Sequence, residues 1–149
     1  MRWHDSPISE LEQRDMSNAN IEIVKRIYDC FHAGDLNGLL EYFAEDVTWD
    51  HRGLGAPDSP KNKLFHGKDG VQVFFKTVED TQEVLEHGVT DYVASSDQVV
   101  AIGFFRARVK ATGKEVASDW AQVWTVKDGL ITAWKAYADF TADAIAFQT

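Results

Sequence analysis

His51 is the titratable side chain that the sequence places most clearly on the inner face of a strand. Side chains alternate along an extended chain, so His51 shares a face with Trp49 and Val47, while Thr48 and Asp50 face the other way. A buried imidazole tends to stay neutral. It can then take a proton from a carbon next to a carbonyl group, or orient a water molecule. The alternative is a core histidine that is hydrogen-bonded to the backbone.

Tyr28 and Gln122 are the polar side chains that we expect beside His51. The Tyr28 hydroxyl could donate to a ligand oxygen, or it could be satisfied inside a plain core. The Gln122 amide offers both a donor and an acceptor, for a ligand or for an internal hydrogen bond. We therefore take His51, Tyr28 and Gln122 as the candidate catalytic residues.

Aromatic side chains dominate the expected inner face. Four of the five tryptophans fall on it, beside small residues such as Gly103 and Ala107. Such rings either fill a core or form the flat walls of a cavity that suits a flat, apolar ligand, including an aromatic one. The candidate ligand-binding residues are all aromatic: Phe31, Trp49, Phe105, Trp120, Trp124 and Trp134.

Three stretches in the first half carry apolar residues at the spacing of a one-sided helix. The stripes are Val24, Ile27, Tyr28 and Phe31; Leu36, Leu39, Leu40 and Phe43; and Val71, Phe74, Phe75 and Val78. Gly34 is expected to end the first helix, Asp35 to begin the second and Asp69 the third. The first helix is expected to begin at Ser17 or Asn18, after a loose polar extension over residues 1–17.

The second half reads as strands over residues 84–94, 99–110, 115–126 and 130–140, followed by a short helix from about residue 141. One-sided helices followed by strands bury their stripes against one face of a sheet. The sequence therefore predicts one α+β domain over residues 18–149. A curved antiparallel sheet would wrap around three N-terminal helices, with a short C-terminal helix at its end.

The two hairpin turns decide which residues face inward. A two-residue turn at Thr112–Gly113 would set Phe105 opposite Trp120 and Gly103 opposite Gln122.

The next turn is ambiguous, because a shift of one residue exchanges the faces. A three-residue loop over Lys127–Gly129 turns Trp134 inward, and a two-residue turn at Asp128–Gly129 turns Lys135 inward. We favour the three-residue loop, since a lysine buried among tryptophans would be costly without an anion.

Composition narrows the choice of partners. The chain has 149 residues and a formal charge of −9, from 15 basic and 24 acidic side chains. This charge argues against nucleic acid or an anionic membrane as a partner. The single cysteine, Cys30, leaves no internal disulfide, and with no apolar N-terminal run we expect a cytoplasmic protein. Metal-ligand spacing and nucleotide-binding motifs are lacking, so we expect no metal and no cofactor.

Several segments together resemble one family. They are Ala33–Leu36, Tyr42–Trp49, Gly67–Val71 and Trp124–Ile131. In order and spacing they resemble the SnoaL-like, ketosteroid isomerase-related proteins of the nuclear transport factor two-like superfamily, over about residues 20–148. The resemblance implies a cone-shaped α+β barrel. It also implies a homodimer through the outer sheet face, which here would carry Ile131, Ala133 and Tyr137.

The chemistry of individual family members does not carry over with the fold. The resemblance puts the base of ketosteroid isomerase at His51, its tyrosine at Ile27, next to Tyr28, and its protonated aspartate at Gln122. All three residue types differ, so that isomerisation is not implied. The charged residues of limonene epoxide hydrolase would fall on Gly103, Phe105 and Ala136, none of which ionises.

Three functions fit these observations. The first is a cofactor-free isomerase, dehydratase or cyclase that abstracts a proton from a small hydrophobic, oxygenated molecule. The second is a non-catalytic module that binds such a ligand, and the third is a protein-interaction domain. An open mouth lined by Trp49 and His51 would favour the first two, and a mouth plugged by the terminal helix or by residues 1–17 would favour the third.

Overall fold

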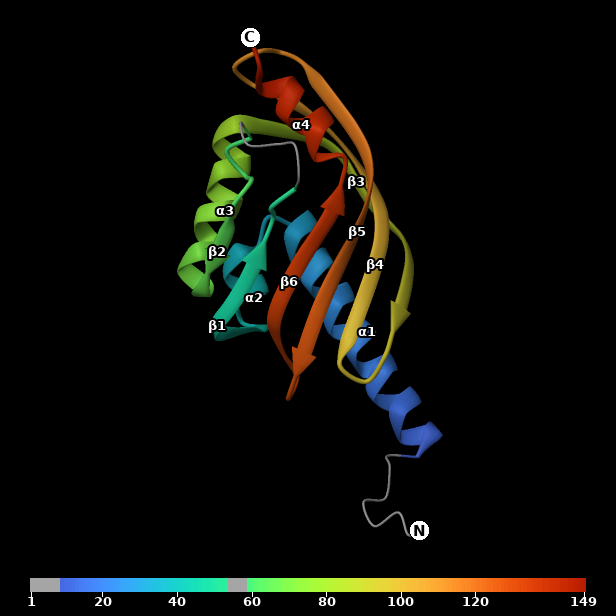
Figure 1. The fold of residues 1–149 in the computed structure, drawn as a ribbon. Helices are drawn as coiled ribbons and strands as arrows, with labels where there is room; N and C mark the ends of the chain where they lie inside the picture. The colour runs from blue at the N-terminus through green and yellow to red at the C-terminus, as the bar shows by residue number, and fades with distance from the viewer. Residues whose placement is uncertain (1–8, 54–58) are drawn as a thin grey trace.

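A curved sheet carries three helices on its concave side and a fourth at one end (Figure 1). The computed structural model describes residues 9–53 and 59–149. The helices are α1 (Glu10–His32), α2 (Leu36–Leu40), α3 (Gly67–Thr81) and α4 (Phe140–Phe147). The strands are β1 (Phe43–Asp50), β2 (Leu64–His66), β3 (Gln82–Ala94), β4 (Gln98–Val109), β5 (Glu115–Lys127) and β6 (Leu130–Ala138). The α+β class and the short C-terminal helix are confirmed.

The sheet is mixed and is not closed into a barrel. Its strand order is β2-β1-β6-β5-β4-β3. β1 runs parallel to β6, while the other neighbours are antiparallel. The predicted antiparallel pairing is confirmed for every neighbouring pair except β1 and β6, for which it was wrong. The chain leaves β1 through β2 and α3 before the meander returns beside β1, and a crossover of that length is what a parallel pair requires.

The first helix begins at Glu10, well before the expected start at Ser17 or Asn18. The Ser9 hydroxyl accepts a hydrogen bond from the backbone N–H of Glu12, 3.1 Å away, and so caps the helix. Residues 10–17 are mostly strong helix formers. All of them are at least partly exposed, so this part of the helix has no apolar stripe from which it could be predicted. The loose extension was thus wrong over residues 10–17, and residues 1–8 lie outside the described residues.

α1 is the longest helix and its surface is largely polar. No helix within residues 9–53 and 59–149 is both long and apolar enough to cross a bilayer.

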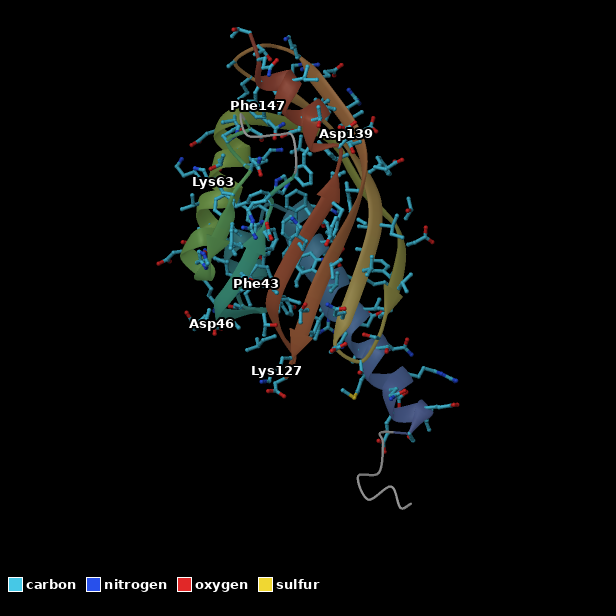
Figure 2. The ribbon with its side chains drawn as sticks, in the orientation of Figure 1. Phe43, Asp46, Lys63, Lys127, Asp139 and Phe147 are labelled. Atoms are coloured by element: carbon cyan, nitrogen blue, oxygen red, sulfur yellow. The ribbon has the colours of Figure 1, made fainter. Side chains whose placement is uncertain are left out.

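The helical corner forms as expected, but its second helix is short. Gly34 has φ +72°, and the backbone N–H of Gly38 donates to Asp35 Oδ1 at 2.9 Å. α2 ends at Leu40, and Phe43 begins β1 instead of completing the helical stripe. Phe43 is still fully buried, because it pairs with Ile131 across the parallel β1–β6 ladder (Figure 2).

The β4–β5 hairpin has a different register from the one expected. Gly103 lies opposite Trp120, and Phe105 lies opposite Ser118. The loop is longer than two residues, since the backbone N–H of Val109 donates to Lys114 O at 2.8 Å. The pairing is displaced by two residues, which changes the partners but keeps the faces. The inward side chains are therefore those that were predicted.

The β5–β6 hairpin reaches the predicted faces by another route. Asp128 and Gly129 form a two-residue turn, both with positive φ, and Lys127 pairs with Leu130. Thr132 is then left without a paired residue on β5, and this irregularity exchanges the inward and outward faces for the rest of β6. The three-residue loop was therefore wrong, whereas the predicted inward position of Trp134 is confirmed, because Trp134 pairs with Trp124 and is buried.

The same irregularity overturns one expectation about the outer face of the sheet. Ile131 is fully buried in the core. Tyr137 is 55% exposed and does lie on the outer side.

Candidate functional site

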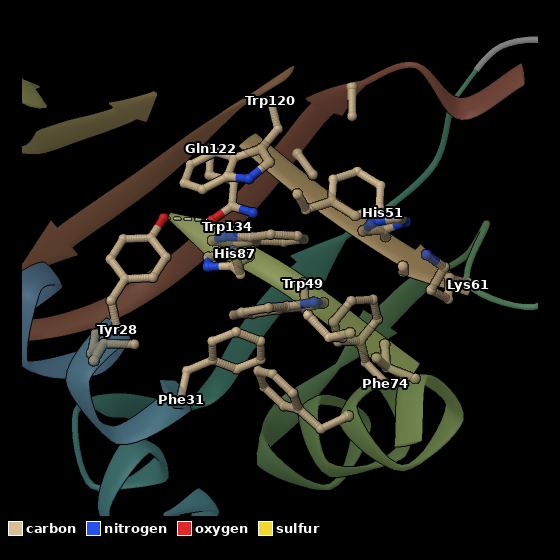
Figure 3. A pocket seen from close by; sticks show the side chains of 18 of the residues that line it. Tyr28, Phe31, Trp49, His51, Lys61, Phe74, His87, Trp120, Gln122 and Trp134 are labelled. Atoms are coloured by element: carbon tan, nitrogen blue, oxygen red, sulfur yellow. Dashed lines mark hydrogen bonds between the residues drawn. The ribbon is translucent and has the colours of Figure 1, made fainter. Parts of the chain in front are cut away.

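A pocket lies between the concave face of the sheet and the helices α1, α2 and α3 (Figure 3). All nine residues predicted for the site line it: Tyr28, Phe31, Trp49, His51, Phe105, Trp120, Gln122, Trp124 and Trp134. The cavity volume open to water-sized spheres is about 110 Å³. One ordered water needs roughly 10–15 Å³ by the same measure. The pocket therefore has room for several waters or for a small organic molecule.

A stack of flat rings forms one wall. Trp49 and Trp134 are parallel to within 10°, with ring centroids 3.9 Å apart. They stack because the parallel β1–β6 ladder pairs these two residues directly. His51 continues the stack from Trp134, with a centroid distance of 5.8 Å and an interplanar angle of 14°. The wall is thus flat, largely apolar, and ends in an imidazole.

A second group of rings surrounds Trp120 on the same concave face of the sheet. His87 stacks on it at 5.1 Å and Tyr28 at 5.9 Å, both nearly parallel. Phe31 contacts the His87 ring from α1 at 4.9 Å. The Trp120 ring can lie close to the sheet because Gly103 stands opposite it, where any Cβ would come within 2.4 Å of the indole.

Tyr28 and Gln122 belong to one hydrogen-bonded network. The Tyr28 hydroxyl donates to Gln122 Oε1 at 2.5 Å and accepts from Trp124 Nε1 at 3.1 Å. Burial raises the pKa of Tyr28 above its ordinary range, although the bond from Trp124 opposes this. The hydroxyl is therefore protonated and already engaged. The amide nitrogen of Gln122 is the polar group that this network leaves for a ligand.

His51 is enclosed where β1 ends. Its ring contacts Phe74 from α3 and Phe140 from α4, with centroid distances of 5.1 and 4.9 Å. Burial lowers its pKa to about 3, and the positive charge of Lys61 adds to this effect, while Asp143 opposes it. The imidazole is therefore neutral at physiological pH. Because Phe140 of α4 covers it, His51 does not stand at an open mouth, and this one feature is the one expected of a protein-interaction domain; the cavity behind the ring is nevertheless not filled.

Four buried polar atoms on the pocket walls have no hydrogen-bond partner among the described residues. They are the indole nitrogens of Trp49, Trp120 and Trp134 and the Nδ1 atom of His51. Buried polar groups are nearly always paired, and each exception calls for a water or a ligand. The walls of this cavity therefore present four buried polar atoms that have no partner among the described residues.

The sequence did not point to Lys61, which lies on the pocket wall in a buried ion pair. Its Nζ is 3.0 Å from Asp143 Oδ1, and the two side chains are 6% and 4% exposed. The same carboxylate accepts from Ser59 Oγ at 2.9 Å and from Gln82 Nε2 at 3.1 Å. Burial lowers the pKa of Lys61, against the effect of Asp143. No signal in the sequence joins two residues 82 positions apart.

His87 was also missed. It lies on β3, where the pairing shifts between Val84 and Glu86 and again between Val89 and Asp91. Val84 and His87 therefore both line the pocket, although they are three positions apart and regular alternation would place them on opposite faces. Burial lowers the pKa of His87 to about 4, with the charge of His32 as the second cause. Simple alternation along the strand could not have identified this face.

The outward acid on β1 behaves as expected. Asp50 accepts two hydrogen bonds from the Arg52 guanidinium, at 2.9 and 3.0 Å, and lies 3.4 Å from Lys135 Nζ. These bonds lower its pKa to about 2. Among the described residues, no three His, Cys, Asp or Glu side chains are grouped so as to hold a metal ion.

The fold and part of the sequence match known proteins. Residues 24–134 match the sequence model of the SnoaL-like domain. A structure of an NTF2-like protein from Burkholderia xenovorans LB400 is 27% identical, with 89% of this chain and 98% of that chain covered and a TM-score of 0.80. A protein from Mesorhizobium loti, assigned as a SnoaL-like polyketide cyclase, is also 27% identical, with 78% and 97% covered and a TM-score of 0.65.

A third similar structure is TerC, which was co-crystallised with polyporic acid. It is 22% identical, with 88% of this chain and 99% of that chain covered and a TM-score of 0.74, and at this identity the likeness is one of fold. A search of curated proteins finds no match.

Proposed function

The chain belongs to the SnoaL-like domain family, and on that basis we propose that its pocket binds a small, flat, hydrophobic molecule that carries oxygen atoms. The observation that carries this proposal is the set of four unpartnered polar atoms on aromatic walls. Parallel rings such as Trp49 and Trp134 suit a flat ligand, and indole N–H groups suit oxygen acceptors. The Mesorhizobium loti relative, assigned as a polyketide cyclase, supports a small-molecule substrate for this kind of pocket.

Calorimetric titration with naphthalene and with 2-naphthol tests this proposal. Both are flat, and only 2-naphthol carries oxygen, so we expect it to bind about tenfold more tightly than naphthalene. Replacing Trp49, Trp120 or Trp134 by Phe keeps a ring but removes a free N–H, and at least one replacement should abolish the advantage. Trp124→Phe is the matched control, because that N–H is already bonded to Tyr28. Equal binding of the two probes to the wild type would contradict the proposal.

We propose in addition that His51 transfers a proton to or from the bound ligand. Its Nδ1 is free of any hydrogen bond to the described residues, and its imidazole is neutral at physiological pH. A neutral imidazole next to a flat ketone can remove a proton from the carbon beside the carbonyl group. The reaction class is then a cofactor-free isomerisation, dehydration or cyclisation.

Deuterium exchange into 2-tetralone, a flat ketone with acidic C–H groups, tests this step. NMR in heavy water should show exchange faster than in buffer alone, and His51→Gln should slow it about 10²-fold. His66→Gln, at an exposed position on β2, should leave the rate unchanged. Exchange at the wild-type rate in His51→Gln would remove His51 from the chemistry. Binding of 2-tetralone without any catalysed exchange would favour the non-catalytic ligand-binding module.

A further inference from the structure

The ion pair at the pocket wall is unequally satisfied. The Asp143 carboxylate receives three hydrogen bonds, from Lys61, Ser59 and Gln82. The Lys61 ammonium has three N–H donors, and within residues 9–53 and 59–149 it has one hydrogen-bond acceptor, Asp143. The carboxylate thus accepts three hydrogen bonds, whereas two of the three ammonium N–H groups have no acceptor among these residues.

The N–H groups without an acceptor belong to Lys61, which is the member of the ion pair that faces the cavity. Lys61 lines the pocket, whereas Asp143 is not one of the lining residues. The face of Phe105 lies 5.9 Å from Lys61 Nζ, which covers part of the ammonium without using its N–H groups. Gln82, the other polar neighbour, has its amide turned to Asp143.

The described lining of the pocket contains this cation and no carboxylate. The imidazoles of His51 and His87 are neutral at physiological pH, so the ammonium is the charge that the cavity presents. A buried ion pair is a weak source of stability, because desolvation offsets most of the attraction between the charges. Its position on a ligand pocket therefore calls for a functional explanation.

We infer that Lys61 binds an anionic oxygen of the ligand, a carboxylate or an enolate, and that Asp143 positions Lys61 for this contact. The inference rests on the proposed function and narrows its ligand to flat molecules with an acidic oxygen at one end. Asp143 fixes the ammonium at the wall, and Ser59 and Gln82 fix Asp143. Charge-assisted hydrogen bonds in a water-poor site are the strong ones, so the anion should dominate affinity.

Two pairs of probes test the inference by calorimetry. 2-Naphthoate is compared with 2-naphthamide, which has nearly the same shape without the charge. 2-Hydroxy-1,4-naphthoquinone, an ionised enol at neutral pH, is compared with its 2-methoxy ether. The wild type should bind the anion of at least one pair about tenfold or more tightly than the neutral partner. The pair that shows the preference identifies the source of the oxygen.

Substitutions then assign the preference to Lys61. Lys61→Met alone would leave Asp143 buried and uncompensated, so the test uses the double variant Lys61→Met/Asp143→Asn. The asparagine oxygen can accept from Gln82 Nε2 and its amide N–H can donate to the Ser59 hydroxyl, and the variant carries neither charge. It should bind the neutral probes as the wild type does and lose the preference for the anions. Lys135→Met, on the outer face, removes the same charge without touching the pocket and should keep the preference.

Each outcome bears on a different claim. Binding of the neutral probes without any preference for the anions overturns the inference and leaves the proposed function standing. An anion preference that survives in the double variant also overturns it. Failure of all four probes to bind the wild type counts against the proposed pocket and therefore against both claims.

Discussion

His87 Nδ1 lies 3.0 Å from His32 Nε2, so a ring on the pocket wall is hydrogen-bonded to a ring on the exposed last turn of α1. One nitrogen must donate and the other accept, which requires that at least one of these two atoms carries a proton. Protonation of both rings would place two donors and two charges against each other. The pair is therefore stable when at least one ring is neutral, and the lowered pKa of His87 indicates that its ring is the neutral one.

Acidification should destabilise the fold through His51 and His87. Their folded-state pKa values, about 3 and about 4, lie below the ordinary 6.5, so the unfolded chain binds more protons between these limits. Stability is fully present above pH 6.5 and falls as the pH drops below it. Each histidine contributes a slope of up to about 1.4 kcal/mol per pH unit.

Urea denaturation at several pH values between about 5 and 7.5 measures this slope. His51→Gln and His87→Gln should each flatten it, whereas His66→Gln, at an exposed position, should not. A wild-type slope in both buried-histidine variants would show that neither imidazole is held neutral by the fold.

Tyr28→Phe should destabilise the protein although it removes a single oxygen atom. The change leaves Trp124 Nε1 and Gln122 Oε1 without their partner, and an unsatisfied buried group costs about 1–3 kcal/mol. Tyr137→Phe is the matched control, because Tyr137 is 55% exposed and its loss of a hydroxyl should change stability by less than about 0.5 kcal/mol. Equal urea midpoints for the two variants would place the Tyr28 network outside the forces that hold the fold.

Most of the fold follows from local patterns in the sequence. The stripe of Val24, Ile27 and Tyr28 predicts α1, and the strand ends agree with the structure to within two residues in the second half of the chain. Two local features could not be predicted from such patterns. An exposed helical turn such as residues 10–17 needs no apolar stripe, and an irregularity such as the one at Thr132 follows from pairing between strands.

The candidate site also contains residues that the sequence predicts and residues that it does not. The inward tryptophans follow from alternation, since a two-residue error in register keeps the faces of Trp120 and Trp124. Alternation could not identify Lys61 or His87. Lys61 is buried in an ion pair with Asp143, which is distant in the sequence, and His87 lies between two irregularities of β3. A lysine does lie buried among the aromatic rings after all, and Asp143 is the anion that such a lysine requires.

We propose that the outer face of the sheet forms a homodimer. Ile102 and Phe104 are each 39% exposed there, and Tyr137 lies in the same cross-strand row as Ile102. Light scattering after size-exclusion chromatography should give twice the chain mass of 16.8 kDa for the wild type. Phe104→Glu should shift it to the monomer, because a charge would be buried in the interface, while Val73→Glu, on exposed α3, should not. A monomeric wild type at all concentrations would contradict the dimer.

A high-resolution crystal structure grown with 2-naphthol tests most directly whether the aromatic pocket is a ligand site. The predicted result is flat density between the Trp49–Trp134 stack and Trp120. The oxygen should lie within about 3.2 Å of His51 Nδ1 or of one free indole nitrogen. Side chains closing the space, or density for the probe only on the outer surface of the molecule, would contradict the proposed function.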